Sequence, residues 1–338
     1  MENNFIKSVE AIEGHNAGMP VKLVFLPDIP GKNINDKKDY CIKNLDYIRK
    51  LLTYEPRSAS NSYGVIVTSK SSEDGDVSAI YFDISGWHDM CGHATLFLGS
   101  YLVKKKLINS SDNGITEVKI DAPAGRVVVN VSSLNGTVKN ASLKNVPSFI
   151  HSVYSIPLNG KNIEVTVAFG GDFYAVIDLD DLNLKYSKDI LPELHKIALQ
   201  VMEKLYSKNI VHPLNSNING LYGVRFQSII DRNSMYGILF FGSRDRLILD
   251  RSPSGTSSSA HLAYLYFNKK LEVNREIKFL SSIDTVFRGK VLNEIKLNGY
   301  NAIIPEILTL DRGCYITKFS KYVIDMDDKI NEGFEPPL

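Results

Sequence analysis

The chain has 338 residues but only three cysteines, one tryptophan and no long apolar run. Cys41, Cys91 and Cys314 are odd in number and far apart, so we expect no disulfide framework and a reducing, cytoplasmic location. No stretch approaches the roughly 20 apolar residues of a membrane-spanning helix. The first residues lack the basic end and apolar segment of a signal peptide. A secreted or membrane protein is therefore not expected.

An excess of charge of one sign is also missing. The chain carries 39 lysines and arginines against 38 acidic residues, which gives a formal net charge of +1 at pH 7. This balance gives no electrostatic reason to expect nucleic acid or an acidic surface as a partner. The composition, 43% hydrophobic and 23% charged, is typical of a globular protein, and the length suggests two domains.

Much of the chain has the pattern of short strands separated by turn residues. Alternation and β-branched residues predict strands at residues 21–26, 63–68, 127–131, 163–169 and 174–177. Apolar residues at helical spacing predict amphipathic helices at residues 43–52 and 191–206. We therefore expect a mixed α/β (α+β) protein.

Two further predicted helices, residues 94–106 and 256–270, are apolar on nearly every face up to a basic end. A helix that is apolar all round must be surrounded by protein, so each is expected to lie within a sheet. The two helices begin alike, because Met-Cys-Gly-His precedes the first and Pro-Ser-Gly-Thr opens the second. Cys91 and Ser254 thus hold matching positions about half a chain length apart. This match has two possible explanations, a diverged internal duplication or a coincidence of two residues.

The first helix start could carry chemistry. A cysteine before a helix feels the positive end of the dipole and can accept hydrogen bonds from free amides, so we expect a lowered thiol pKa for Cys91. Gly92 permits close approach of a ligand, and His93 adds a titratable group. Two facing helix starts would form a site for a small carboxylate.

Three other interpretations of this segment stay open. Cys91 could be a buried structural cysteine, as most free cysteines are. His88, Cys91 and His93 could be metal ligands, although a fourth partner and the usual paired spacing are missing. A Cys-His hydrolase would need an oxyanion site and an orienting residue that the sequence does not supply.

Both helix starts resemble signatures of the proline racemase family. Residues 90–95 read Met-Cys-Gly-His-Ala-Thr, close to the family's Met-Cys-Gly-His-Gly-Thr. Residues 250–256 read Asp-Arg-Ser-Pro-Ser-Gly-Thr, close to its Asp-Arg-Ser-Pro-Cys-Gly-Thr. Further similar blocks extend the resemblance over nearly the whole chain, at residues 12–20, 55–57, 63–64, 169–175 and 285–289.

This resemblance implies a diaminopimelate-epimerase-like fold of two similar domains, each a sheet wrapped around a central helix, with the active site between them. The expected first domain is 1–150 plus 305–338, and the second is 151–304. The family resemblance also implies a homodimer that uses neither pyridoxal phosphate nor a metal. Its partner would be a small-molecule substrate, proline or a hydroxyproline, and not nucleic acid or a membrane.

The resemblance also implies roles for site residues. Backbone amides around Gly92, His93, Gly255 and Thr256 would bind the substrate carboxylate. His93 and Asp250 would hold the ring nitrogen. Racemases and epimerases of this family place an acid/base residue, normally cysteine, on each face of the α-carbon.

Here Cys91 fills the first of these acid/base positions, but Ser254 fills the second. A hydroxyl has a pKa far above that of a thiol, so two-way racemisation is disfavoured. A single base at Cys91 resembles the pattern of the family's trans-3-hydroxy-L-proline dehydratases, although these usually carry threonine at the position of Ser254. The resemblance therefore implies dehydration of trans-3-hydroxy-L-proline, with Cys91 as base and Ser254 either assisting or inert.

Two alternatives remain. The first is a hydroxyproline epimerase or proline racemase, with Ser254 or water as the second acid. The second is a non-catalytic member or one with a different substrate, because Asn16 and Met19 depart from the family's opening motif. His88 and the serines after Thr256 are expected to be structural.

Overall fold

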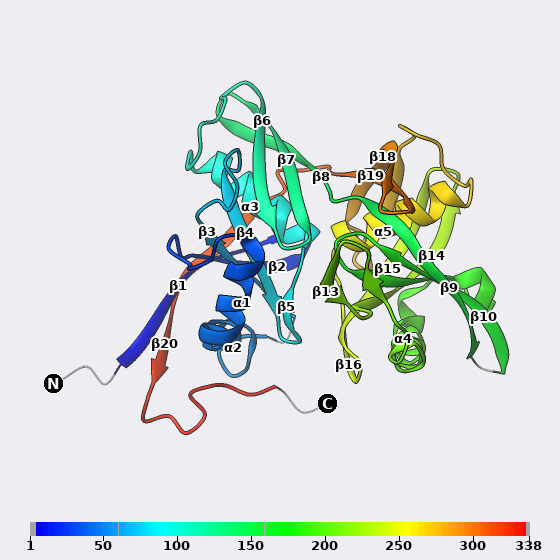
Figure 1. Cartoon of the computed structure of the whole chain (residues 1–338), viewed down its shortest axis with the longest axis horizontal. Coiled ribbons are helices and arrows are strands. Elements are labelled where there is room, and N and C mark those ends of the chain that lie inside the picture. The colour runs from blue at the N-terminus through cyan, green and yellow to red at the C-terminus, as the bar shows by residue number, and fades with distance from the viewer. Residues whose placement is uncertain (1–4, 60, 159, 336–338) are drawn as a thin grey trace.

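The computed structural model describes residues 5–59, 61–158 and 160–335, and strands are its commonest element (Figure 1). The helices are α1 (Ile34–Asn44), α2 (Asp46–Thr53), α3 (Gly92–Lys104), α4 (Leu191–Leu205) and α5 (Gly255–Phe267). The first ten strands are β1 (Phe5–Asn16), β2 (Met19–Phe25), β3 (Tyr63–Thr68), β4 (Val77–Asp83), β5 (Gly86–His88), β6 (Gly114–Ala122), β7 (Gly125–Leu134), β8 (Thr137–Lys144), β9 (Ser148–Leu158) and β10 (Lys161–Phe169). The others are β11 (Phe173–Asp178), β12 (Val211–His212), β13 (Asn215–Asn219), β14 (Gly223–Asp231), β15 (Ser234–Ser243), β16 (Arg246–Leu249), β17 (Ile277–Leu280), β18 (Val286–Leu297), β19 (Tyr300–Thr309) and β20 (Tyr315–Asp325).

The two apolar helices lie inside the strands, as their composition predicts. α3 packs against β1, β2, β3, β7 and β8, and all its residues from Gly92 to Val103 are buried. α5 packs against β9, β10, β11, β18 and β19. Figure 1 shows the resulting two groups side by side, one around α3 and one around α5. Below, these are called the α3 group and the α5 group.

Strand pairing connects the two groups and returns the chain to the first one. β19 pairs with β18 of the α5 group and also with β8 and β9. β20 then pairs antiparallel with β1 in the α3 group. The expected boundary at residue 305 falls within β19, so the limits of the two domains stay a prediction.

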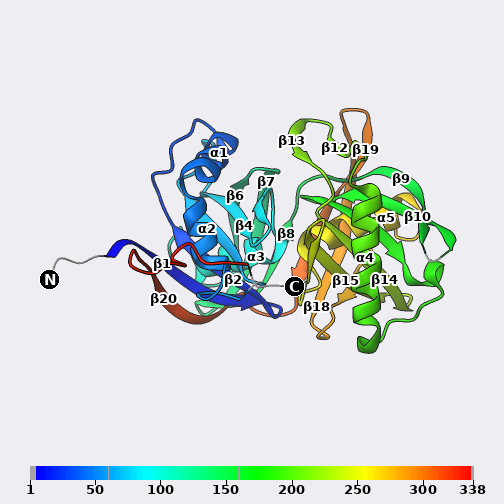
Figure 2. The same ribbon diagram turned by 90° about the horizontal axis from the view of Figure 1, so that it is seen from below.

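The other helices cover the outside of these groups. α4 matches the helix predicted at residues 191–206 and packs against β9, β14 and β16 on one side of the α5 group (Figure 2). The helix predicted at residues 43–52 is confirmed as α2 from Asp46 onward, but the chain breaks at Leu45, and residues 43 and 44 belong to α1. Leu45 has φ −123° and ψ 13°, which ends α1 and starts α2. The start of α1 is set by Asn33, whose side chain accepts a hydrogen bond from the Asp36 amide.

Polar side chains meet at the ends of several strands. Tyr63 begins β3, and Asp83 ends the antiparallel neighbour β4. His88 ends β5, where it pairs with Tyr81 of β4. Tyr222 immediately precedes β14 in the α5 group. This arrangement brings these polar groups to the side where the two groups of elements meet.

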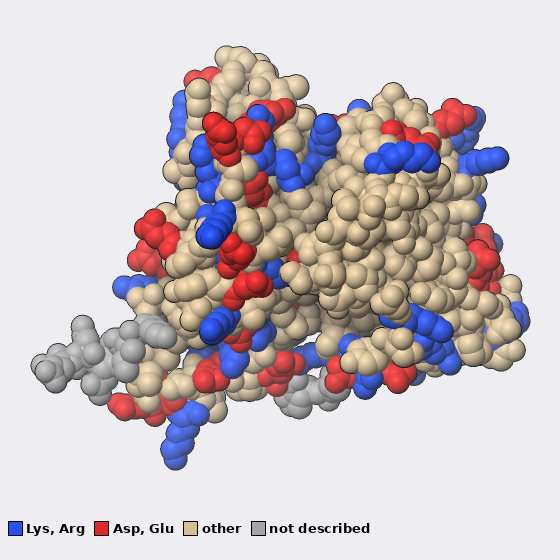
Figure 3. All heavy atoms as spheres, in the orientation of Figure 1, with Lys and Arg blue, Asp and Glu red and all other residues tan. Residues whose placement is uncertain are grey.

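Acidic and basic side chains are interspersed on the face in Figure 3, without a large area of one sign. Within the described ranges, no helix is long and apolar enough to cross a bilayer.

Candidate active site

The starts of α3 and α5 touch each other. A Cβ atom on Gly255 would lie 2.6 Å from the Cα of Gly92, and one on Gly92 would lie 3.0 Å from the amide nitrogen of Thr256. Only glycine allows the two backbones to approach this closely. The unpaired amides and positive dipole ends of two helices therefore point to one place.

Cys91 is the residue before α3 and is 4% exposed. Burial raises the pKa of its thiol well above the ordinary value, and the nearby carboxyls of Asp250 and Asp172 add to this, although the Ala94 amide and the Tyr63 hydroxyl act in the opposite direction. The expectation of a lowered thiol pKa is therefore wrong for the free protein, because loss of hydration outweighs the helix start. The thiol is protonated at neutral pH.

His93 lies beside this thiol. Its Nδ1 is 3.3 Å from Cys91 Sγ, and its ring stands at 82° to the ring of Tyr63. Burial lowers the pKa of His93 to about 3, so the imidazole is neutral at neutral pH. A neutral imidazole can accept one hydrogen bond and donate another.

Ser254 occupies the matching position before α5, but its hydroxyl is already engaged. Ser254 Oγ accepts a hydrogen bond from the Ser257 amide at 3.2 Å and so caps the helix. Its φ of +62° is unusual for a residue other than glycine. The two helix starts therefore differ in chemistry as well as in sequence.

Asp250 and Thr256 complete the set of residues predicted from the sequence. Asp250 Oδ1 accepts hydrogen bonds from the amide and the hydroxyl of Ser252, at 2.7 and 2.9 Å. Burial raises the pKa of Asp250 to about 6. The hydroxyls of Thr256 and Tyr174 are 2.7 Å apart. The structure thus brings Cys91 and His93 together with these groups and the touching glycines at one buried place.

No motif in the sequence pointed to the buried Arg225 of β14. Its Nη1 donates to Ser257 Oγ at 2.7 Å and to the Pro253 carbonyl at 3.1 Å, and its Nε donates to His261 Nδ1 at 3.2 Å. Burial lowers the pKa of Arg225 to about 9, while the charge of Asp250 favours its protonated form. At neutral pH a cation therefore lies directly behind the start of α5.

A second unexpected feature is a chain of polar groups next to Cys91. The hydroxyls of Tyr63 and Tyr222 are 2.9 Å apart, and Tyr222 donates to Asp83 Oδ2 at 2.8 Å. Asp83 Oδ1 lies 2.9 Å from His88 Nε2. Burial acts to raise the pKa of Asp83, but His88, Ser85 and Tyr222 outweigh it and hold this pKa below the usual value. His88, expected to be structural, is thus part of a polar network.

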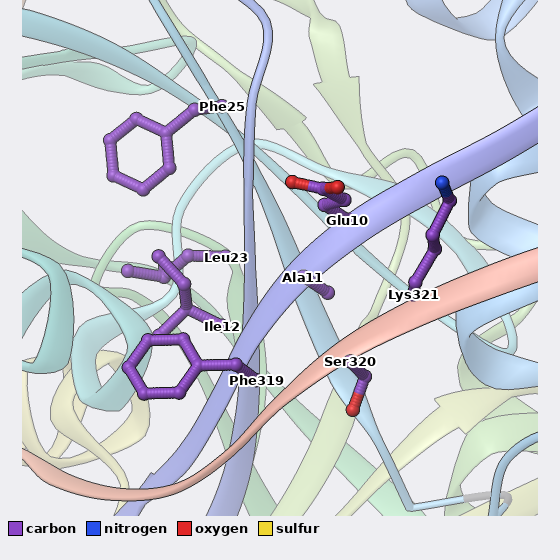
Figure 4. A pocket seen from close by; sticks show the side chains of 8 residues that line it. All are labelled: Glu10, Ala11, Ile12, Leu23, Phe25, Phe319, Ser320 and Lys321. Carbon is purple, nitrogen blue, oxygen red and sulfur yellow. The ribbon is translucent and has the colours of Figure 1, made fainter.

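The site is closed, since Cys91, His93, Asp250 and Ser254 are each at most 4% exposed. An open cavity of about 500 Å³ lies elsewhere, on the face of β1, β2 and β20 (Figure 4). It is lined by Glu10, Ala11, Ile12, Leu23, Phe25, Phe319, Ser320 and Lys321. None of the candidate site residues lines this cavity.

Known proteins resemble this chain along its whole length. It is 33% identical to a proline racemase from Acetoanaerobium sticklandii, over 98% of this chain and 99% of the relative. It is 29% identical to a trans-3-hydroxy-L-proline dehydratase from Bacillus cereus, over 97% and 98%. The fold matches the crystal structure of a hydroxyproline epimerase from Agrobacterium vitis with trans-4-hydroxy-L-proline bound, with a TM-score of 0.89 over 98% of this chain and 95% of the other, at 22% identity. The family model described as proline racemase matches residues 11–335. The chain therefore belongs to the proline racemase family.

Proposed function

We propose that this protein is an enzyme acting on a proline-type amino acid, and that it dehydrates trans-3-hydroxy-L-proline to Δ1-pyrroline-2-carboxylate. The observation that carries the proposal is the difference between the two helix starts. Cys91 offers a thiol, whereas the Ser254 hydroxyl is occupied as a helix cap. One acid/base group on one face of the α-carbon suits an elimination better than an inversion.

The substrate carboxylate is held, in this proposal, by backbone amides of Gly92, His93, Gly255 and Thr256. The first amides of each helix lack partners within the helix, and two dipoles and the Arg225 cation converge behind them. Asp250 is ionised above about pH 6 and pairs with the ring ammonium, which neutral His93 helps to orient. The same proposal places the site between the two predicted domains of a homodimer.

Cys91 must first lose its thiol proton, because the thiol is protonated in the free protein, and the resulting thiolate then removes the α-hydrogen. The negative charge that develops on the α-carbon and carboxylate is stabilised by the amides and helix ends that already face it. The hydroxyl on the adjacent carbon then leaves as water, and the resulting enamine tautomerises to the cyclic imine. One molecule of water is lost, and nothing is oxidised or reduced.

An epimerase or racemase is the second candidate. The observation that favours it is the 33% identity with a proline racemase, compared with 29% for the dehydratase. In that case Ser254 or a water molecule would deliver a proton to the other face of the α-carbon.

Proton NMR in heavy water separates these candidates. The protein is incubated separately with trans-3-hydroxy-L-proline, trans-4-hydroxy-L-proline and L-proline, beside a Cys91→Ala variant. Cys41→Ala, which removes a buried thiol far from the site, is the matched control. Loss of the 3-hydroxy substrate to a pyrroline, absent only in Cys91→Ala, supports the dehydratase. A deuterated epimer of either other substrate would instead establish the isomerase.

A further inference from the structure

Next to Cys91 begins a series of hydrogen bonds that the reaction described above does not yet use. The Tyr63 ring packs edge-on against His93, whose Nδ1 lies 3.3 Å from Cys91 Sγ. The hydroxyls of Tyr63 and Tyr222 are 2.9 Å apart. The series continues through Asp83 to His88, with distances of 2.8 and 2.9 Å. Tyr63 is 3% exposed, Asp83 is 1% exposed and His88 is 8% exposed, whereas Tyr222 is only partly buried.

The direction of these hydrogen bonds is fixed by the carboxylate. Ionised Asp83 can only accept, so Tyr222 donates to it and its oxygen accepts from Tyr63. The hydrogen bond from Tyr63 lowers the pKa of the Cys91 thiol, so Tyr63 acts as a donor toward the thiolate. Its phenolic proton can therefore serve the site as well as Tyr222.

The stereochemistry of the proposed substrate brings its leaving group to the same region. In trans-3-hydroxy-L-proline the carboxylate and the hydroxyl are on opposite faces of the ring, so the α-hydrogen and the hydroxyl share a face. A base that removes this α-hydrogen therefore stands on the side from which the hydroxyl departs. Hydroxide is a poor leaving group and needs a proton donor on that side.

We propose that Tyr63 is the general acid that protonates the departing 3-hydroxyl, and that Tyr222, Asp83 and His88 hold its hydroxyl in position. This inference rests on the proposed dehydratase function and names the acid that this reaction requires. Tyr63 fits the role by position, because its hydroxyl adjoins the Cys91 thiol and its ring packs edge-on against His93.

The proton balance closes within these residues. The α-C–H bond breaks and the proton binds Cys91 Sγ; the C3–O bond breaks as the leaving oxygen takes the phenolic proton of Tyr63. Tyr63 is reprotonated by the Cys91 thiol, which regenerates the thiolate, so the proton taken from the α-carbon replaces the proton that left with the water. Burial raises the pKa of Tyr63 well above its usual value, so Tyr63 remains a proton donor at neutral pH.

The decisive variant is Tyr63→Phe, assayed with trans-3-hydroxy-L-proline in heavy water. We expect pyrroline formation to fall about 100-fold or more, as for loss of a general acid. Deuterium exchange at the α-carbon of recovered substrate should persist, because Cys91 still removes the proton. Tyr222→Phe should reduce pyrroline formation by a smaller factor. Tyr81→Phe removes another fully buried hydroxyl, bonded to Thr95, and should leave both rates unchanged.

A second substrate distinguishes acid catalysis from a merely structural role. Fluoride leaves without prior protonation, so Tyr63→Phe should still eliminate it from trans-3-fluoro-L-proline at a rate near that of the unmodified protein. Equal loss of exchange, dehydration and fluoride elimination would overturn the proposal, as would undiminished dehydration. If the unmodified protein forms an epimer and no pyrroline, the dehydratase function itself falls and the role of Tyr63 falls with it.

Discussion

At the scale of single residues, burial decides the charge states of the site. Cys91 and His93 are both largely neutral at neutral pH, and Asp250 changes charge near pH 6. Because a protonated Asp250 cannot pair with the ring ammonium, kcat/KM should rise from about pH 5 to pH 7 and follow a pKa of about 6. The measurement is the pH dependence of kcat/KM, which reports the free enzyme. The Asp250→Asn variant should have low activity, and its kcat/KM should lack this acidic limb, the rise from about pH 5 to pH 7.

Substitution of Arg225 should shift the acidic limb of this pH profile. Its charge lowers the pKa of Asp250, so its removal should raise that pKa. The acidic limb of Arg225→Met is therefore expected above pH 6, whereas Arg225→Lys keeps the charge and should lie near the original profile. An unchanged limb in Arg225→Met would mean that Asp250 does not control it.

Ser254 gives the second prediction at this scale. Ser254→Cys places a thiol at the start of α5 and should produce a deuterated epimer of L-proline in heavy water, whereas we expect the unmodified protein to form none. Ser254→Ala loses only the helix cap and should form no epimer. Both variants should lose about 1 kcal/mol of stability, measured by denaturant unfolding, because the cap to Ser257 is weakened or absent. Epimer formation by the unmodified protein would contradict this prediction.

At the scale of elements, the contact between α3 and α5 sets the geometry of the site. Gly92→Ala would force the two helix starts apart, since its Cβ would meet the backbone of Gly255 and Thr256. We expect a loss of activity of about 100-fold, because small displacements of reacting groups have such effects. Overpacking should also destabilise the fold by about 1–3 kcal/mol. Activity assays and thermal unfolding measure the two effects.

The control for this variant is Gly299→Ala, in the turn between β18 and β19. Gly299 has φ +87° and no atom near its missing Cβ, so alanine there introduces backbone strain of about 1–2 kcal/mol without a clash. If Gly299→Ala is destabilised as much as Gly92→Ala but remains active, the activity loss of Gly92→Ala arises in the site and not from lower stability. Similar activity losses in both variants would point to stability alone.

The helices that carry the site were predictable because their signals are local. The apolar runs and small-residue starts gave α3 and α5 to within a few residues. The break at Leu45 was missed, because the apolar spacing of residues 43–52 continues across it. Local patterns therefore located α3, α5 and the surface helix α4, but not α1 or the break that separates it from α2.

At the scale of the whole molecule, the sequence could not reveal contacts between distant segments. Tyr63 and Tyr222 are 159 residues apart in the chain, and Arg225 lies 36 residues before His261. Neither pair belongs to a local motif, so nothing short of the folded chain brings them together. The direction of the Cys91 pKa shift was missed for the same reason, because burial depends on how both groups of elements pack.

Tyr222 also links the two groups of elements. It comes from the α5 group and bonds Tyr63 and Asp83 of the α3 group, beside a site in which Cys91 is 4% exposed. Access to Cys91 therefore requires the groups to separate. Removal of two hydrogen bonds, each contributing about 1 kcal/mol, should make separation easier. We expect Tyr222→Phe to be alkylated at Cys91 by iodoacetamide up to about 30-fold faster, measured by peptide mass mapping.

Two comparisons test whether this increase reflects opening. Tyr81→Phe loses a buried hydroxyl within the α3 group and should react at the original rate. Pyrrole-2-carboxylate, a planar carboxylate that resembles the carbanion, should slow alkylation of both proteins by holding the helix starts together. If Tyr222→Phe reacts no faster, the contact between the groups does not limit access. If the planar carboxylate gives no protection, it does not bind at the two helix starts, and the site proposed for the substrate carboxylate would have to be placed elsewhere.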